Sequence, residues 1–154
     1  MAFLVNPLLR IASVPQQICR AFHQGQPLSQ IQLLTRLRVV DNSPIGKEAM
    51  LEGRPPKCIH VYNKTRVGTI GDKVLVAIKG QKRRAVIVGV KQKQRAFVPR
   101  FDSNNIVLIE ENGTPIGTRI HVPIPSILRK ILKERSVAKK VDYTKILSIA
   151  TRFV

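Results

Sequence analysis

Phosphate binding is the chemistry that the residue types between Gly80 and Arg100 suit best. This stretch contains no acidic residue. Its basic residues are Lys82, Arg83, Arg84, Lys91, Lys93, Arg95 and Arg100. Ammonium and guanidinium groups form charge-assisted hydrogen bonds with phosphate oxygens. Together with Lys79, and with Lys64 and Arg66 earlier in the chain, these residues are predicted to bind the phosphate backbone of a nucleic acid.

The charge of the whole chain points to a large polyanionic partner. Its 154 residues include 27 Lys and Arg against 9 Asp and Glu, which gives a formal net charge of +18. Such a charge opposes compaction unless RNA, DNA or an anionic membrane surface neutralises it. The basic cluster follows a β pattern rather than an amphipathic helix, and the apolar runs are too short to span a bilayer. Nucleic acid is therefore the favoured partner, and no membrane insertion is expected.

The expected mode of binding is contact with phosphates and recognition of shape. Phe97 and Phe101 are the aromatic residues near the basic cluster. Two aromatic residues do not favour base stacking as the main source of affinity. The alternative is that the cluster is a solvated charged face, but such a face normally mixes positive and negative side chains.

No arrangement typical of an enzyme accompanies the basic residues. The sequence has no Walker loop, no GxSxG and no HExxH motif. Its cysteines and histidines lack the spacing of metal ligands or of a disulfide framework, and they are Cys19, Cys58, His23, His60 and His121. Asp102, Glu110 and Glu111 could be catalytic carboxylates, but no base, nucleophile or metal set accompanies them. We therefore expect no catalysis, no cofactor and no metal.

Short extended segments are predicted to position the basic residues. Apolar patterns typical of strands occur at residues 33–41, 57–62, 73–79, 85–91, 105–110 and 115–122. Turn-like residues separate several of them, at 41–46, 65–72 and 80–84, and Asn112–Gly113 is a strong hairpin signal. Strands joined without helices suggest an antiparallel barrel or sandwich. A small barrel would enclose its apolar residues and present basic loops at the strand ends. One end would carry Lys79, Lys82, Arg83 and Arg84, and another would carry Lys91, Lys93, Arg95 and Arg100.

After Pro125 the apolar residues follow a helical period. One stripe contains Ile127, Leu128, Ile131 and Leu132. Ser126 could cap this short helix, which the segment 135–140 is expected to break. Asp142 could cap a second short helix over residues 143–150, although the Ile and Thr residues there leave a strand possible.

Residues 1–29 have the composition of a mitochondrial transit peptide. They contain arginines and no acidic residue, and the first acid in the chain is Asp41. Residues 20–25 fit a two-step processing pattern with a final cut after Ser29. The alternative is a disordered basic tail on a bacterial or cytosolic protein. The chain then divides into a transit peptide (1–29), a β-barrel domain that binds RNA (30–124) and a short helical segment of the same domain (125–154).

Several runs of the chain occur in a familiar order, namely TRLRVVDNSPIGKEAM, KCIHV, VGTIGDKVLVAIK, AVIVGV, RFDSNNIVLI and PIGTRI. They cover roughly residues 31–154 and resemble the large-subunit ribosomal protein L-fourteen family. With the transit peptide, the chain looks like a mitochondrial member of that family. The resemblance implies a mostly β fold, with a small closed five-stranded β-barrel and short C-terminal helices, and no enzymatic activity.

The resemblance also implies a set of partners. The chain would be a structural constituent of the mitochondrial large ribosomal subunit, located in the matrix and supporting mitochondrial translation. It would bind large-subunit ribosomal RNA at the subunit interface, beside other large-subunit proteins and facing the small subunit. The positions that match the family's contacts with the ribosomal silencing factor are Thr118, Arg119 and Lys145. Their modest positive rim around apolar residues suits an acidic protein partner.

Differences from the family leave other interpretations to be tested. The hairpin at residues 80–84 is shorter than in bacterial relatives, so RNA contacts made there by the relatives are not expected to carry over in full. A free-standing RNA-binding regulator on a small β-barrel would show a dominant ribosome-free pool on a sucrose gradient. An RNA-acting enzyme would need a clustered acid–base or metal set near the basic loops, which the sequence does not offer.

Overall fold

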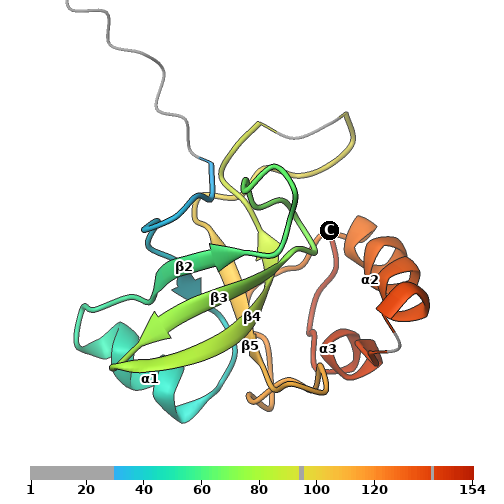
Figure 1. The fold of residues 1–154 in the computed structure, drawn as a ribbon. Coiled ribbons are helices and arrows are strands. Elements are labelled where there is room, and N and C mark those ends of the chain that lie inside the picture. The colour runs from blue at the N-terminus through green and yellow to red at the C-terminus, as the bar shows by residue number, and fades with distance from the viewer. Residues whose placement is uncertain (1–29, 94–95, 140) are drawn as a thin grey trace, which may run out of the picture.

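The computed structural model describes residues 30–93, 96–139 and 141–154, and Figure 1 shows how they are arranged. The predicted transit peptide and the predicted phosphate ligand Arg95 lie outside the described residues. The elements in chain order are β1 (Arg38–Val39), α1 (Pro44–Leu51), β2 (Lys57–Val61), β3 (Lys73–Ile78), β4 (Gln81–Gly89), β5 (Asn105–Ile109), α2 (Ile127–Lys139) and α3 (Thr144–Ser148).

The strands form one five-stranded sheet in the order β1-β5-β4-β3-β2. Strands β2 to β5 pair antiparallel with their neighbours, and β1 pairs parallel to β5. The prediction of a closed barrel is wrong, because β1 and β2 are the two edges of this sheet. β1 has two residues, and the chain before it meets β2 at an isolated bridge between Arg36 and Lys57. Such a short strand cannot supply the continuous ladder that closure requires.

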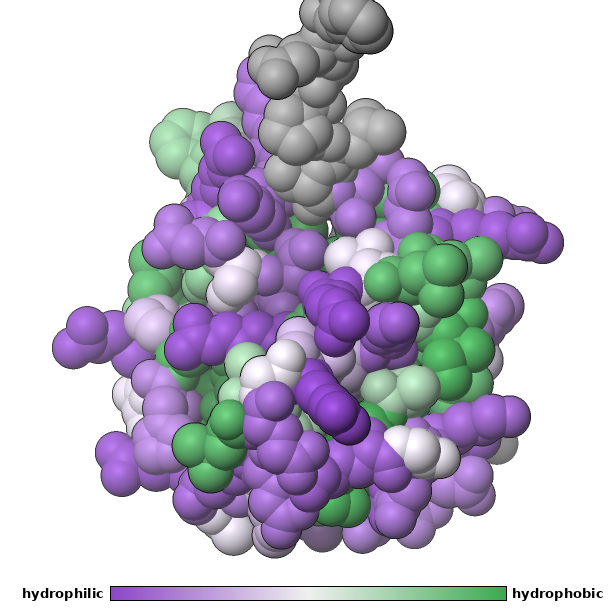
Figure 2. Space-filling model, turned by 90° about the vertical axis from the view of Figure 1, so that its left-hand side faces the viewer, coloured by the Kyte–Doolittle hydropathy of each residue, from purple (hydrophilic) through white to green (hydrophobic). Residues whose placement is uncertain are grey.

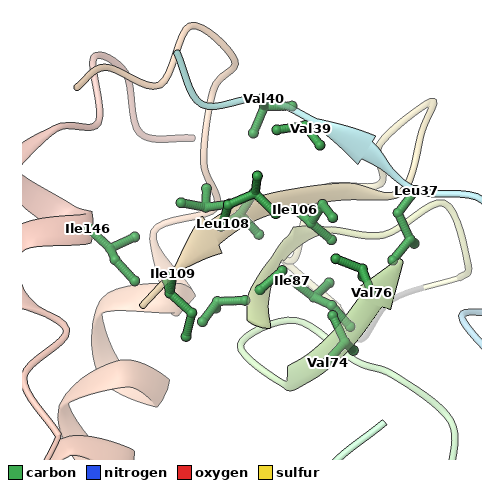
Figure 3. Packing of buried hydrophobic residues seen from close by; sticks show 14 of the residues in the cluster. Leu37, Val39, Val40, Val74, Val76, Ile87, Ile106, Leu108, Ile109 and Ile146 are labelled. Atoms are coloured by element: carbon green, nitrogen blue, oxygen red, sulfur yellow. The ribbon is translucent and has the colours of Figure 1, made fainter. Parts of the chain in front are cut away.

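The core lies between the sheet, the N-terminal segment and the C-terminal helices. On β3, buried Val74, Val76 and Ile78 alternate with half-buried residues, which is the pattern of a strand with one covered face. Every residue of β5 is buried, so both of its faces are covered. Figure 3 shows the aliphatic side chains of β1, β3, β4 and β5 packed against one another. Each fully buried side chain of this size contributes about 1.5–3 kcal/mol.

The β3–β4 hairpin is tighter than the sequence suggested. The predicted turn at 80–84 is wrong, because β4 already begins at Gln81. Lys79 and Gly80 form the connection with φ values of 47° and 75°. Positive φ at both central residues is the mark of a two-residue type I′ turn, whose twist matches that of paired strands. Lys82, Arg83 and Arg84 are therefore strand residues and not loop residues.

Two N-terminal features and one late segment also differ from expectation. The turn predicted at 41–46 and the loop after it contain α1, which begins with Pro44 in its first turn, where proline is well tolerated. The extended segment at 115–122 forms no named strand. It makes isolated bridges instead, at Pro115 and at Ile120.

The two C-terminal helices are present, and α2 is longer than predicted. Instead of breaking at residue 135, α2 continues to Lys139, and Arg135 is bonded to the β2–β3 loop. α3 is a helix and not a strand. The carboxylate of Asp142 accepts a hydrogen bond from the backbone N–H of Thr144 (2.8 Å), and this bond lowers the pKa of Asp142. Figure 1 shows both helices on the side of the sheet away from β2.

Candidate nucleic-acid interface

Two basic loops lie at the same end of the sheet. Because neighbouring strands run antiparallel, the β2–β3 loop and the β4–β5 loop both leave the end of the sheet that Figure 1 shows at the top. The exposed basic residues of these loops are Lys64, Arg66, Lys91, Lys93 and Arg100, and we call them the loop-end cluster. Within the described part of the chain, none of the five forms a salt bridge.

The first of these loops is held by a buried carboxylate. Asp72 is 2% exposed, and its Oδ2 accepts hydrogen bonds from the N–H and hydroxyl of Thr69 (2.7 and 2.8 Å) and from Asn63 (3.3 Å). Its Oδ1 is paired with the guanidinium of Arg135. The same guanidinium donates to the carbonyl of Gly71. The loop that carries Lys64 and Arg66 is thereby fastened to α2.

The second loop is anchored at its two ends. The N–H of Lys91 donates to Asn104 Oδ1 (3.0 Å), and Arg100 Nε donates to the carbonyl of Lys91 (2.9 Å). A Cβ on Gly89 would lie 3.0 Å from the ring of Phe101, so glycine permits this close approach. A cleft of about 490 Å³ separates the two loops from α2, and Thr69, Lys93 and Arg135 are among its lining residues.

The remaining predicted phosphate ligands lie at the opposite end of β4. Lys79, Lys82, Arg83 and Arg84 form what we call the hairpin cluster. β4 has nine residues, so the two clusters are separated by roughly 20–30 Å along the strand. The sequence placed these residues in one basic stretch, but the strand between them divides them into two sites.

Most of the hairpin cluster is already bonded within the protein. Lys79 Nζ lies 2.6 Å from Glu48 and 2.8 Å from Glu52, both on or next to α1. The hydrogen bond to Glu48 is the main reason why the pKa of Lys79 is raised. Arg84 pairs with Glu111 at 3.1 Å, and Arg83 donates to Gln81 (3.0 Å). Lys82 is exposed and forms no salt bridge within the described residues.

The predicted protein-partner residues lie on neighbouring segments. Thr118 Oγ1 accepts a hydrogen bond from Asn42 (3.3 Å), and Ile120 forms a parallel bridge with Ala150, just after α3. Lys145 lies on α3, whose end is bonded to the Ile120 segment. Thr118, Arg119 and Lys145 are all exposed. The structure therefore places these exposed residues on neighbouring segments of the chain.

Close packing fixes the segment that carries Thr118 and Arg119. Gly117 lies against Asp41, and a Cβ there would lie 2.6 Å from Asp41 Cβ and 2.8 Å from the backbone nitrogen of Asn42. Asp41 is buried, and burial raises its pKa even though Ser43 donates a hydrogen bond to its Oδ1 (3.0 Å). Its Oδ2 accepts no hydrogen bond within the described residues.

Sequence reasoning missed further polar residues. The outer face of β2 carries Lys57 and the rings of His60 and Tyr62, which meet edge-to-face with centroids 5.0 Å apart. Figure 2 shows that hydrophilic residues predominate on this side of the molecule, with separate hydrophobic areas between them. On α2, the basic residues Arg129, Lys130 and Lys133 are exposed, as their position outside the apolar stripe of the predicted helix led us to expect. Simple alternation does not identify the exposed residues of β2, because the strand has a register shift between Cys58 and His60.

The acidic residues singled out in the sequence are not assembled into a catalytic site. Glu111 pairs with Arg84, and Glu110 accepts a hydrogen bond from Thr114 (2.9 Å). In the described ranges, no group of His, Cys, Asp and Glu is arranged to hold a metal ion. Over the same ranges, no helix has the length and apolar character needed to cross a membrane.

Comparison with known proteins shows the family to which the chain belongs. A family model for ribosomal protein L14p/L23e matches residues 30–154. The chain is 56% identical over 135 residues to the Danio rerio protein named large ribosomal subunit protein uL14m, and the match covers 88% of this chain and 89% of the relative. These matches confirm the predictions of a mitochondrial large-subunit ribosomal protein, of a matrix location and of a structural role without enzymatic activity. Ribosomal RNA and other ribosomal proteins are accordingly its partners. The chain belongs to the ribosomal protein L14p/L23e family.

Proposed function

We propose that the loop-end cluster is the principal site for ribosomal RNA on this protein. The observation that carries the proposal is that five exposed cations on two loops share one end of the sheet, with no salt bridge among the described residues. Anchored loops present these charges with little loss of backbone entropy on binding, which favours contact with a fixed phosphate lattice.

The hairpin cluster has a smaller part in this function. Lys82 is available for a phosphate contact, and half-buried Arg83 is a further candidate. Lys79 and Arg84 are paired with acids, so binding RNA would require them to give up those partners.

Sedimentation with the large subunit tests the assignment of the RNA site. We expect the double variant Lys64→Ala, Lys93→Ala to be depleted from the large-subunit peak of a sucrose gradient made from mitochondria. The matched control is Lys79→Ala together with Lys82→Ala, which removes the same charge at the other end of β4 and should sediment nearly as the wild type does. Equal depletion of both variants would show that total charge, and not the loop-end cluster, determines incorporation.

We further propose that Thr118, Arg119 and Lys145 bind the ribosomal silencing factor at the face turned toward the small subunit. Support comes from their exposure on adjoining segments and from the two cations beside half-buried apolar residues such as Ile149. An acidic partner would be attracted to this surface. A pull-down with the silencing factor should weaken for Arg119→Glu and Lys145→Glu while both variants still enter the large subunit. Loss of subunit entry with intact pull-down would assign the surface to RNA instead.

We also propose that residues 1–29 are removed on import into mitochondria. The acid-free, arginine-containing composition of this segment supports the proposal, and so does a family match that starts at residue 30. N-terminal sequencing of the protein from purified mitochondria should begin at residue 30. An intact Met1 or Ala2 terminus would contradict this.

A further inference from the structure

A small groove between α2 and α3 shares no lining residue with the loop-end cluster, with the hairpin cluster or with Thr118, Arg119 and Lys145. Its volume is about 290 Å³. Leu132, Tyr143 and Leu147 form its floor, and Arg129, Lys133 and Ser136 lie at its rim. We call it the α2–α3 groove.

The charged side chains at this rim are both positive. The hydroxyl of Ser136 donates to the carbonyl of Lys133 (2.7 Å), one turn earlier on the same helix. The guanidinium carbon of Arg129 lies 3.8 Å from the centroid of the Phe153 ring, a cation–π contact that holds it in place. The groove therefore combines an apolar floor with two positively charged side chains.

The charge around the groove is not balanced within the protein. α2 contains a single acidic residue, Glu134, beside its basic residues. In the part of the chain that the structure describes, Arg129 and Lys133 take part in no salt bridge. An occupant that supplies carboxylates would gain complementary charge at this rim.

We propose that the α2–α3 groove binds an acidic segment of a neighbouring protein, which inserts one Leu or Phe side chain against Leu132, Tyr143 and Leu147. Apolar insertion surrounded by opposite charges is the arrangement of a central anchor with a polar rim. A second copy of this chain would bring a net charge of +18 to a positive rim, and residues 1–29 contain no acid. Both are therefore unsuitable occupants. The apolar floor offers few hydrogen-bonding groups for the polar edge of an RNA base.

This groove is distinct from the surface proposed for the silencing factor. Successive residues of a helix are rotated by about 100°. Thr144 and Leu147 of α3 line the groove, so Lys145 points to another side of that helix. Charge reversal at Lys145 should accordingly leave the groove unaffected.

Binding of a labelled synthetic peptide to the full chain tests the proposal. The probe is a short amphipathic peptide with Leu along one side and Glu on both flanks, followed by fluorescence anisotropy. We expect Lys133→Glu and Ser136→Phe to weaken binding about tenfold each, the first by charge repulsion and the second by filling the groove without changing charge. Lys130→Glu is the matched control, because it makes the same charge change on the same helix outside the groove lining, and Lys145→Glu is the control for the other surface. Both controls should change binding less than twofold.

Equal weakening by Lys130→Glu and Lys133→Glu, or no effect of Ser136→Phe, would overturn the proposal, because binding would then reflect general charge attraction. Thermal unfolding of each variant establishes that it is folded.

A second measurement uses assembled large subunits. A photo-cross-linking amino acid at position 136 should attach to an acidic protein segment and not to RNA. A cross-link to RNA would assign the groove to nucleic acid and overturn the proposal, even if the loop-end cluster proves to bind RNA as proposed.

Discussion

Arg135 of α2 and Asp72 at the start of β3 form an ion pair whose carboxylate is almost fully buried. The pair joins the C-terminal helix to the loop that carries Lys64 and Arg66. The position of this loop therefore depends on a side chain more than 60 residues away in the sequence.

Replacing Arg135 by Ala should destabilise the fold by about 2–3 kcal/mol, because it leaves the buried Asp72 carboxylate without its cation. The partial exposure of Arg135 keeps the loss below that of a fully buried pair. Urea unfolding followed by circular dichroism measures the change. The control Lys130→Ala, on the exposed side of the same helix, should alter stability by less than about 0.5 kcal/mol. Similar stability of both variants would mean that water replaces the guanidinium at no cost.

The dependence of RNA affinity on salt should come mainly from the loop-end cluster. The double variant Lys64→Ala, Lys93→Ala should reduce the slope of log affinity against log salt by about one unit for each lysine. Lys79→Ala should change it less, because Glu48 and Glu52 already neutralise that ammonium. Filter binding of a large-subunit RNA fragment over a series of salt concentrations measures the slopes. If Lys79→Ala changed the salt slope more than the double variant did, the RNA site would have to be assigned to the hairpin cluster instead.

Gly117→Ala should cost about 1–3 kcal/mol, because the added methyl group would overlap Asp41 and Asn42. It should also weaken binding of the silencing factor, since the segment with Thr118 and Arg119 has to shift. Gly53→Ala is the control: nothing lies within 4 Å of its Cβ position, and its φ of +66° adds only backbone strain. Urea unfolding and pull-down assays measure the two effects. A smaller loss of stability and of silencing-factor binding for Gly117→Ala than for Gly53→Ala would contradict this interpretation.

Asp41 should make stability depend on pH in the direction opposite to that of a paired carboxylate. Burial raises the pKa of Asp41, so the folded protein binds this proton more tightly than the unfolded chain does. The resulting stabilisation is present in acid and is lost as the pH rises through the folded-state pKa. Asp41→Asn keeps the side chain neutral and should be more stable than the wild type near neutral pH.

The advantage of Asp41→Asn should shrink as the pH falls toward the ordinary carboxyl value. Urea unfolding of both proteins at several pH values measures this difference, with the exposed Asp102→Asn as a control for the change in charge. A difference that stays constant with pH would show that Asp41 acts through packing alone.

Central strands were predictable from sequence because their apolar runs are long enough to mark them. β3 and β5 lie within the predicted segments, and β4 overlaps its predicted segment. Buried apolar residues such as Val74, Val76 and Ile106 are the ones that mark these strands in the sequence. α1 was missed because its local signals, a proline and a glycine, also mark turns. Its helical state depends on packing of buried Gly46 and Ala49.

The residue types of the candidate site and their division between two strand ends were predictable, but the position of the turn and the ion pairs were not. The composition of a basic stretch does not determine the position of a turn within it. Because the turn is at Lys79–Gly80, the residues Lys82, Arg83 and Arg84 belong to β4. The pairing of Lys79 with Glu48 links residues 31 positions apart, and no local pattern encodes such a pair. The barrel was inferred from short strands joined without helices and from the family resemblance, whereas closure depends on the length and register of β1.

The parallel pairing of β1 with β5 has a consequence for the order in which the chain can fold. Arg38 lies opposite Asn105, with β2, β3 and β4 between them in the sequence. During synthesis, which proceeds from the N-terminus, β1 therefore has no partner strand in the sheet until β5 has been made. The β3–β4 hairpin, closed by two residues, can form at once because its loop costs little entropy. The first strand in the sequence is thus among the last to dock. A chain interrupted before residue 105 can still bond Leu34 to Cys58 and Leu37 to Pro56, but it has no partner strand for β1.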